Sequence, residues 1–355
     1  MTVSRKVFRS TAAALVVLGV VVVGGCNPGV SASTVPSTDA AGVPLSLLID
    51  TDVAPDDLVA IAFLLASPGV DIKAITVSGT GEAHCREGVD VVLRLLERLD
   101  APMIAVACGR ETPMAGDHAF PDAWRAAADS GSGLDLPATS RLPFDGDAAE
   151  LLSETSNDVK GLHVLTLGPL TNLADALERE PDLVTRLGPV TAMCGAVRVP
   201  GNVMFGGPSD NQVAEWNIYV DPTAAQTVID SGLRVRLVSL DGTGQVPVTT
   251  AYADRVREEA TGPGALVLAE LFDTHSFMTD DSYYLWDPLA AALAAGRPLG
   301  SFSPARVDVE EAEGPEAGFT RPIDGDPNVE YLSSADAAAA EDTLLDTLNH
   351  PGDAP

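Results

Sequence analysis

Four aspartates fall within eight residues near the start of the chain, directly after an apolar run. They are Asp50, Asp52, Asp56 and Asp57. Like charges this close repel one another strongly in a low dielectric unless something positive lies between them. Carboxylate oxygens are the ligands that hard divalent cations such as Ca²⁺ and Mg²⁺ take in proteins. The cluster therefore predicts a metal site.

A simpler interpretation is a solvated helix N-terminus, where acidic side chains favour the helix macrodipole. That interpretation accounts for Asp56 and Asp57, which come just before an apolar helical stretch. It does not account for Asp50 and Asp52, which stand at the end of a predicted buried strand. We therefore favour the metal site.

The aspartates occupy a predicted turn between a strand and a helix. Residues 43–49 form an apolar run that is typical of a buried strand, and residues 58–65 continue as a helix. Further strands are expected at 71–77, 103–107, 162–167, 189–194 and 235–240, and helices at 88–99, 148–156, 170–179 and 222–230, the last capped by Asp221. This alternation predicts an α/β fold with a mainly parallel sheet flanked by helices, a Rossmann-like core. Such sheets bind ligands at the turns that follow their strands.

The composition indicates one folded domain with extra segments at both ends. No composition break appears inside residues 44–330, so we expect a single domain over 44–333. Residues 109–146 are rich in Gly, Pro, Asp and Ala and resemble a long active-site loop. Residues 334–355 form an acidic, Ala-rich C-terminal tail, with a surface helix expected at 334–348.

The N-terminus is predicted to be a targeting segment. Arg5, Lys6 and Arg9 precede an apolar stretch that is too short to span a membrane, and small residues then lead to Cys26. This pattern resembles a bacterial lipoprotein signal peptide over residues 1–25, with Cys26 lipidated and residues 26–43 serving as a flexible tether. The alternative is an ordinary secretory leader with an incidental cysteine. We expect an exported protein that is lipid-anchored to the bacterial cell membrane and faces outward.

Charge and cysteine content narrow the possible partners. The chain has 21 basic and 51 acidic residues, a net charge of -30, which argues against nucleic acid and against anionic membrane beyond the lipid anchor. Assembly into a homo-oligomer remains a possibility.

Of Cys85, Cys108 and Cys194, one pair could be oxidised outside the cytoplasm. Their spacing suits no metal motif, and we expect buried small hydrophobic residues.

Several later segments carry polar groups that suit recognition of sugar hydroxyls. Asn202, Glu215 and Asn217 surround an apolar element, and short amides and carboxylates presented in this way can bind hydroxyls. The alternative is that they form side-chain turns and a helix cap. Asp287, between Trp286 and a proline, could likewise be only an N-cap.

Together these segments resemble the nucleoside hydrolase family, whose members include inosine-uridine-preferring and purine-specific enzymes. The resemblance runs from about residue 45 to at least residue 300, through motifs at 50–57, 168–172, 214–219 and 286–288. In the first motif, Val53-Ala54 replaces the family's Pro-Gly, so the turn must differ locally. In the last, Trp286 replaces a histidine.

The resemblance implies a Ca²⁺ ion at the bottom of the pocket that binds the ribose 2′ and 3′ hydroxyls. Its protein ligands here would be Asp52, Asp57, the carbonyl of Leu167 and Asp287. Asp52 would also be the general base, taking a proton from a Ca²⁺-bound water whose pKa the cation lowers.

The family pattern also assigns residues to the substrate, a small-molecule nucleoside. Asp56 and Asn217 would bind ribose hydroxyls, with Asn202 and Glu215 near the 5′ end. The segment between Asn202 and Glu215 is about seven residues longer than the family pattern leads us to expect. Clustered carboxylates would also stabilise an oxocarbenium-like transition state.

The base-binding residues resemble those of the purine-specific branch, which sandwiches the base between tryptophans. Trp286 and Trp124 would supply that stack, and Glu82 could touch the base. Ordinary packing of the tryptophans and surface exposure of Glu82 are the alternatives. The predicted function is Ca²⁺-dependent hydrolysis of ribonucleosides, purines preferred, to ribose and free base.

Two other functions fit parts of the sequence. A haloacid-dehalogenase-like phosphatase would use Asp50 and Asp52 with Mg²⁺, but it needs a downstream lysine that neither Lys73 nor Lys160 supplies persuasively. A non-catalytic nucleoside- or sugar-binding lipoprotein could use the same fold. Release of free ribose separates hydrolysis from binding alone.

Overall fold

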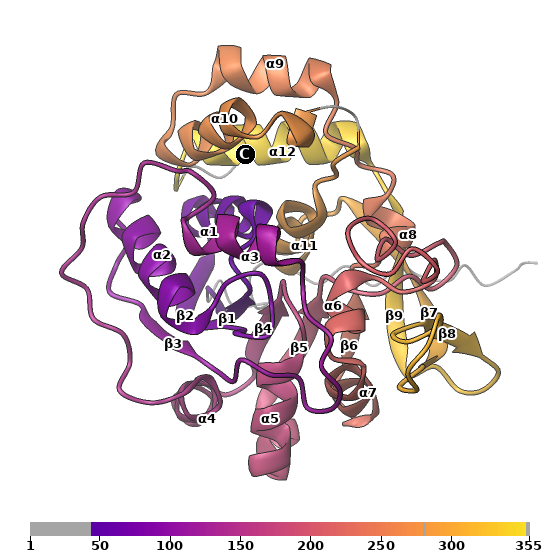
Figure 1. Ribbon diagram of the computed structural model, residues 1–355. Helices are drawn as coiled ribbons and strands as arrows, with labels where there is room; N and C mark the ends of the chain where they lie inside the picture. Colours follow the sequence, from indigo (N-terminus) through magenta and orange to yellow (C-terminus); the bar gives the residue numbers. More distant parts are fainter. Residues whose placement is uncertain (1–43, 280–281, 353–355) are drawn as a thin grey trace, which may run out of the picture. The chain divides into compact units, whose positions relative to one another are not determined.

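The computed structural model describes residues 44–279 and 282–352. Within them, strands form a nine-stranded sheet in the order β3-β2-β1-β4-β5-β6-β9-β7-β8 (Figure 1). The strands are β1 (Leu45–Thr51), β2 (Val70–Val77), β3 (Ala105–Cys108), β4 (Leu162–Thr166), β5 (Leu187–Ala192), β6 (Val235–Leu237), β7 (Gly300–Val309), β8 (Thr320–Ile323) and β9 (Val329–Ala335). Only β7 pairs antiparallel, with β8 and β9, so the predicted mainly parallel sheet is confirmed.

Helices connect the strands and cover both faces of the sheet. They are α1 (Pro55–Ala66), α2 (Cys85–Arg98), α3 (Asp122–Asp129), α4 (Ala148–Asp158), α5 (Thr171–Arg179), α6 (Trp216–Val220), α7 (Pro222–Asp230), α8 (Leu240–Thr243), α9 (Thr250–Glu259), α10 (Pro263–Thr274), α11 (Trp286–Ala294) and α12 (Ala337–Asn349), with 3₁₀ turns at Pro181–Thr185 and Ser276–Thr279. None of these helices is long and apolar enough to cross a membrane. The predicted signal peptide, the lipidation site at Cys26 and the tether lie outside the described residues.

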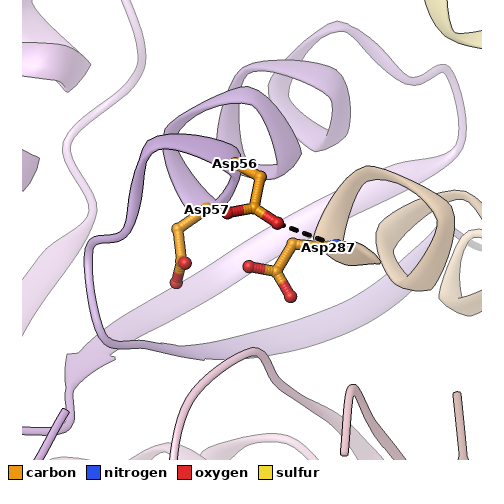
Figure 2. Close-up of side chains that lie close together, drawn as sticks. All are labelled: Asp56, Asp57 and Asp287. Atoms are coloured by element: carbon orange, nitrogen blue, oxygen red, sulfur yellow. Dashed lines mark hydrogen bonds between the residues drawn. The ribbon is translucent and has the colours of Figure 1, made fainter. Parts of the chain in front are cut away.

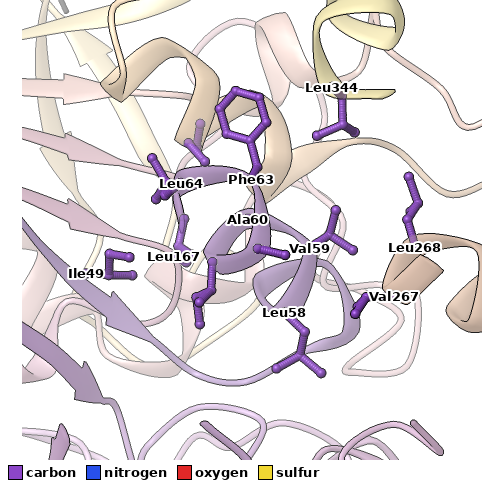
Figure 3. Close-up of a cluster of buried hydrophobic side chains, with 14 of the residues drawn as sticks. Ile49, Leu58, Val59, Ala60, Phe63, Leu64, Leu167, Val267, Leu268 and Leu344 are labelled. Atoms are coloured by element: carbon purple, nitrogen blue, oxygen red, sulfur yellow. The ribbon is translucent and has the colours of Figure 1, made fainter. Parts of the chain in front are cut away.

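Alternation along β1 divides the core into two layers. Leu47 and Ile49 pack on one face with α1, α2, α10, α11 and α12, whereas Leu48 packs on the other face with α4, α5 and α7. Helix α1 lies between the sheet and three helices, so all its apolar residues except the half-buried Leu65 are buried (Figure 3). This burial fixes the start of α1, and with it the acidic turn.

Several expected elements begin or end a few residues away from their predicted bounds, and the structure departs further in two loops. Helix α3 interrupts the predicted loop of residues 109–146, where the surrounding Gly and Pro residues obscured a short Ala-rich helix. Strand β6 ends at Leu237 instead of Leu240, because Ser239 begins the turn into α8. The predicted cap of α7 is confirmed, since the Asp221 carboxylate accepts a hydrogen bond from the backbone N–H of Ala224 at 3.1 Å.

The C-terminal segment is integrated into the domain core. The predicted boundary at residue 333 falls inside β9, which pairs with both β6 and β7. Helix α12 then packs against α1, α10 and α11. Its Leu344, Leu345 and Leu348 are fully buried, while its acidic residues face solvent. The acidic composition of the segment concealed this apolar stripe.

Two of the cysteines form a disulfide. Cys85 at the start of α2 is bonded to Cys108 at the end of β3, and Cys194 is buried and free. The expectation of buried small hydrophobic residues is therefore wrong for Cys85 and Cys108 and right for Cys194. The pairing depends on the parallel alignment of β2 and β3, which brings the chain after β2 beside the end of β3.

We expect Leu348→Ala to lower the free energy of unfolding by about 2–5 kcal/mol, because it leaves a cavity between α12 and its neighbours. Asp346→Ala, an exposed position on the same helix, is the matched control and should change it by less than about 0.5 kcal/mol. Chemical denaturation of both variants measures the difference. Equal stabilities would mean that α12 is dispensable to the fold.

Candidate active site

The turn between β1 and α1 is organised by the carboxylate of Asp57. Its Oδ1 accepts hydrogen bonds from the hydroxyl of Thr51 and from the backbone N–H groups of Asp52, at 3.0 Å, and Val53, at 3.3 Å. Its Oδ2 is buried and has no hydrogen-bond partner among the described residues. One oxygen therefore builds the turn, and the other remains available to a ligand.

Val53 has a backbone conformation that β-branched residues rarely adopt. Its φ is +69°, in the left-handed region, and its side chain is fully buried. A proline, which stands here in the family motif, is held near φ −65° and could not take this conformation. The structure thus agrees with the expectation that this turn differs from the family pattern.

Two glycines make room for Asp52. A Cβ atom at Gly81 would lie 2.1 Å from the Asp52 Cβ, and one at Gly168 would lie 2.6 Å from it. The backbone N–H of Glu82 donates to Asp52 Oδ2 at 3.3 Å, and that of Ala83 donates to the Asp52 carbonyl at 2.9 Å. Asp52 is therefore enclosed by the loops that follow β2 and β4.

Three carboxylates converge where the N-termini of α1 and α11 meet. Oxygen atoms of Asp56, Asp57 and Asp287 lie within 4.8 Å of one another (Figure 2). Asp56 Oδ2 accepts a hydrogen bond from the backbone N–H of Asp287 at 3.5 Å, and Asp287 Oδ1 is buried without a partner. Asp52 is outside this group of three, although it was predicted as a ligand, and Asp56 is inside it.

The alternative interpretations of these acids, as a solvated helix N-terminus or a helix N-cap, are wrong. Asp56 and Asp57 are 6% and 0% exposed, so they do not form a solvated helix terminus. Asp287 is the second residue of α11 and makes no capping hydrogen bond, because Leu285 occupies the N-cap position. Asp50 does leave the cluster, since its Oδ1 accepts hydrogen bonds from Thr76 and Asn172, both at 2.7 Å.

Burial and mutual repulsion raise the pKa values of four acids at the site, Asp52, Asp56, Asp287 and Glu82. Burial, and then the charge of Asp57, raises the pKa of Asp56 to about 7 and that of Asp52 well above its usual value. Burial and the charges of Asp56 and Asp57 raise the pKa of Asp287 well above normal and that of Glu82 to about 8. None of these acids forms an ion pair with a basic side chain within residues 44–279 and 282–352.

The donor set fits a hard divalent cation. Asp57 Oδ2 and Asp287 Oδ1 are buried anionic oxygens with no hydrogen-bond donor, an arrangement that is costly unless a cation binds them. The backbone carbonyl of Leu167 lies at the end of β4 and accepts a hydrogen bond from the Asn217 amide at 2.8 Å. Oxygen ligands of this kind suit Ca²⁺ or Mg²⁺ better than softer metals.

The predicted sugar-binding residues adopt well-defined roles in the fold. Glu215 caps α6 through the backbone N–H groups of Asn217 and Ile218, which confirms the helix-cap interpretation, and burial raises its pKa to about 7. The Asn217 amide nitrogen donates to the carbonyls of Leu167 and Met193. Asn202 Oδ1 accepts from the backbone N–H of Trp216 at 3.1 Å.

The two predicted stacking tryptophans lie in separate aromatic clusters. Trp286 is half-buried and contacts Tyr283 and Tyr284, with ring centroids 4.6 and 5.5 Å away. Trp124 packs instead against Trp216, at 5.3 Å, and Phe120. Glu82 is half-buried and not on the surface.

Tyr283 is a site residue that the sequence reasoning missed. Its hydroxyl donates to Asp56 Oδ1 at 2.7 Å, and its ring meets Trp286 edge-on. A tyrosine three residues before Trp286 was the available signal. It was uninformative alone, because Tyr284 stands beside it and makes no comparable bond among the described contacts.

Comparisons with known proteins fit this geometry. Residues 47–342 match the family of inosine-uridine preferring nucleoside hydrolases. The chain belongs to the nucleoside hydrolase family. The pyrimidine-specific ribonucleoside hydrolase RihA of Salmonella paratyphi B is 35% identical over 233 residues, which cover 64% of this chain and 70% of that protein.

Solved structures agree on the fold of this nucleoside hydrolase. The inosine-uridine preferring nucleoside hydrolase of Bacillus anthracis has a TM-score of 0.78 at 25% identity, covering 86% of this chain and 99% of that one. The purine-preferring ribonucleoside hydrolase of Gardnerella vaginalis has a TM-score of 0.75 at 26% identity, covering 86% and 98%. The chain is therefore an N-glycosyl hydrolase acting on nucleosides, and the phosphatase and pure binding-protein alternatives are set aside.

We expect Tyr283→Phe to raise the KM for ribonucleosides by about tenfold, because a hydrogen bond to a charged group contributes roughly 1.5–3 kcal/mol and here it orients Asp56. Tyr284→Phe removes the same hydroxyl from the next residue and should leave KM within twofold. Steady-state kinetics on the purified variants give both values. If the two variants behave alike, the bond to Asp56 does not contribute to substrate binding.

Proposed function

We propose that this nucleoside hydrolase cleaves the N-glycosidic bond of ribonucleosides in a Ca²⁺-dependent reaction, with Asp52 as general base and a preference for purines. The observation that supports this most directly is the convergence of Asp57 and Asp287, each with a buried, unpartnered carboxylate oxygen. A cation bound between these oxygens would offset the cost of burying them, and the matching family is named for hydrolysis of nucleosides.

In the proposed site, Asp57 and Asp287 hold the cation, and Asp52 and the Leu167 carbonyl complete its protein ligands. Bound there, Ca²⁺ would position two adjacent sugar hydroxyls and lower the pKa of a nearby water. Ca²⁺ is favoured over Mg²⁺ because it accepts more oxygen ligands in irregular arrangements. Asp56 also belongs to the carboxylate cluster, and we propose that its remaining hydrogen-bond acceptor sites bind a ribose hydroxyl.

Each side chain of the proposed site then has its own role in the reaction. Asp52 takes the proton from the attacking water, held in place by the Glu82 N–H and by the close approach of Gly81 and Gly168. The surrounding carboxylates stabilise positive charge as it develops on the sugar C1′. Asn217 binds a ribose hydroxyl, and Asn202 and Glu215 line the 5′ side.

The preference for purines rests on the aromatic surface beside the acids. Trp286 is half-buried and borders the carboxylate cluster through Asp287, so its ring can stack on a base. Trp124 belongs to another aromatic cluster, and we assign it to the second face of the base. The relatives differ on this point, since RihA is named pyrimidine-specific and the Gardnerella enzyme purine-preferring.

We also propose that the protein works outside the cytoplasm, anchored by lipid at Cys26. The Cys85–Cys108 disulfide supports this location, because disulfides persist in oxidising compartments and are rare in the cytosol. The basic and apolar pattern of residues 1–25 points the same way.

We expect Asp52→Asn to keep the fold while lowering kcat by more than ~100-fold, since loss of a general base costs ~10²–10⁴-fold. Ribose release from inosine, adenosine, guanosine and uridine measures turnover, and circular dichroism checks the fold. The wild type should also lose activity in chelator and regain it best with Ca²⁺ among added divalent cations. Near-normal turnover of the variant at saturating metal would contradict the role given to Asp52.

We expect Trp286→Ala to reduce kcat/KM for inosine and guanosine more than for uridine, because a bicyclic base loses more stacking area. Trp124→Ala is the paired variant and tests the second half of the proposed stack. Equal losses on purines and uridine would remove the stacking argument for the residue concerned.

A further inference from the structure

The disulfide closes the loop that encloses Asp52. Residues 78–84 connect β2 to α2 and include the glycine and the N–H groups that contact Asp52. Cys85 follows directly as the first residue of α2, and its partner Cys108 ends β3. The covalent bond thus lies three residues from Glu82 and joins this loop to the edge of the sheet.

Three contacts between this loop and Asp52 depend on its position. Gly81 packs directly on the Asp52 side chain, with no space for a Cβ atom. Glu82 donates its N–H to Asp52 Oδ2 at 3.3 Å, and Ala83 donates its N–H to the Asp52 carbonyl at 2.9 Å. The 3.3 Å bond is already long, so a small outward shift of the loop would break it.

The two ends of the loop are held differently. At the β2 end, buried hydroxyls form a chain in which Thr80 Oγ1 lies 2.9 Å from Thr171 Oγ1, which donates to Asp221. At the α2 end, the noncovalent bonds go from the N–H groups of His84 and Cys85 to the side chains of Asp129 and Glu111. These bonds lie at the surface, where water competes for both partners. Core packing of Ala83 and of the apolar face of α2 also holds that end, and the disulfide adds its covalent restraint at the first residue of the helix.

We propose that the Cys85–Cys108 disulfide is a positioning element of the active site, holding residues 81–83 against Asp52 so that this carboxylate keeps its catalytic orientation. The inference rests on the general-base role proposed for Asp52. Cys85 and Cys108 are both half-buried, so a small dithiol can reach the bond. Reduction by a dithiol consumes two electrons and two protons, leaves two protein thiols, and converts the dithiol to its own disulfide.

The test compares oxidised wild type, wild type reduced with dithiothreitol, and the double variant Cys85→Ser/Cys108→Ser. We expect reduction and the double variant each to lower kcat by about tenfold with KM within twofold, because small misplacements of a catalytic group are costly, whereas Asp56, Asp57 and Asp287, which carry most of the proposed ribose site, lie outside this loop. Reoxidation should restore kcat. Thiol titration confirms the reduction, and assays are run well below each protein's melting temperature.

Two controls isolate the effect of the Cys85–Cys108 disulfide, which we call the clamp. Dithiothreitol should not affect the double variant, and Cys194→Ala, which removes the buried free thiol, should keep the wild-type response to reduction. If reduced wild type, with two new thiols and an intact fold, keeps kcat within twofold, the inference is overturned. A rise in KM together with a fall in kcat, both in proportion to a fall in melting temperature, would also overturn the inference, because it would indicate a purely structural bond.

The Asp52→Asn variant separates this inference from the function proposed above. If the clamp acts through Asp52, reduction should have little further effect on kcat in that variant. A normal Asp52→Asn enzyme would overturn the general-base assignment. An impaired Asp52→Asn enzyme beside a reduced wild type of full activity would overturn the clamp alone.

Discussion

Mutual repulsion among buried carboxylates is the constraint on which the rest of this site depends. Asp56, Asp57 and Asp287 bring three negative groups within 4.8 Å of one another, and Asp52 adds its charge from the adjoining turn. The raised pKa values of Asp52, Asp56 and Asp287 express the cost of this arrangement. A fold that maintained this cost without a compensating cation would gain stability by replacing the acids with apolar residues.

The protein positions these carboxylates with neutral donors. Backbone N–H groups and a threonine hydroxyl fix Asp57, whereas a tyrosine hydroxyl and the N–H of Asp287 fix Asp56. Neutral donors orient a carboxylate and leave its negative charge in place, whereas an arginine would neutralise that charge. The negative potential therefore remains available to a cation and, in the mechanism proposed above, to the positive charge that develops on the sugar. The left-handed Val53 and the glycines around Asp52 follow from this close arrangement.

The sequence predicted where the site lies in the fold better than it predicted which residues form it. Four acids after an apolar run correctly indicated a strand-to-helix turn, because strand and helix periodicities are local properties. The separation of Asp50 from the cluster could not be predicted, since it depends on Thr76 and Asn172 in other elements. Tyr283 was missed for the same reason, and the sequence allowed one oxidised cysteine pair without indicating Cys85 and Cys108, because each is a contact between distant segments. Helix α12 was underestimated because its three acidic residues and its run of alanines conceal the three leucines that anchor it.

The tryptophan at position 286 changes how a departing base can be activated. The family histidine at this position is absent. The hydrogen-bond partners of His84, His118 and His275 are Asp129, Tyr219 and Ser132, none of which belongs to the acid cluster. The ring of Trp286 instead presents an apolar face whose orientation is set by Tyr283 and Tyr284. Because Tyr283 also binds Asp56, one residue connects the aromatic surface to the carboxylates. In the proposed site, Tyr283 thereby couples recognition of the base by Trp286 to binding of the ribose by Asp56, so a substrate would have to satisfy both at once.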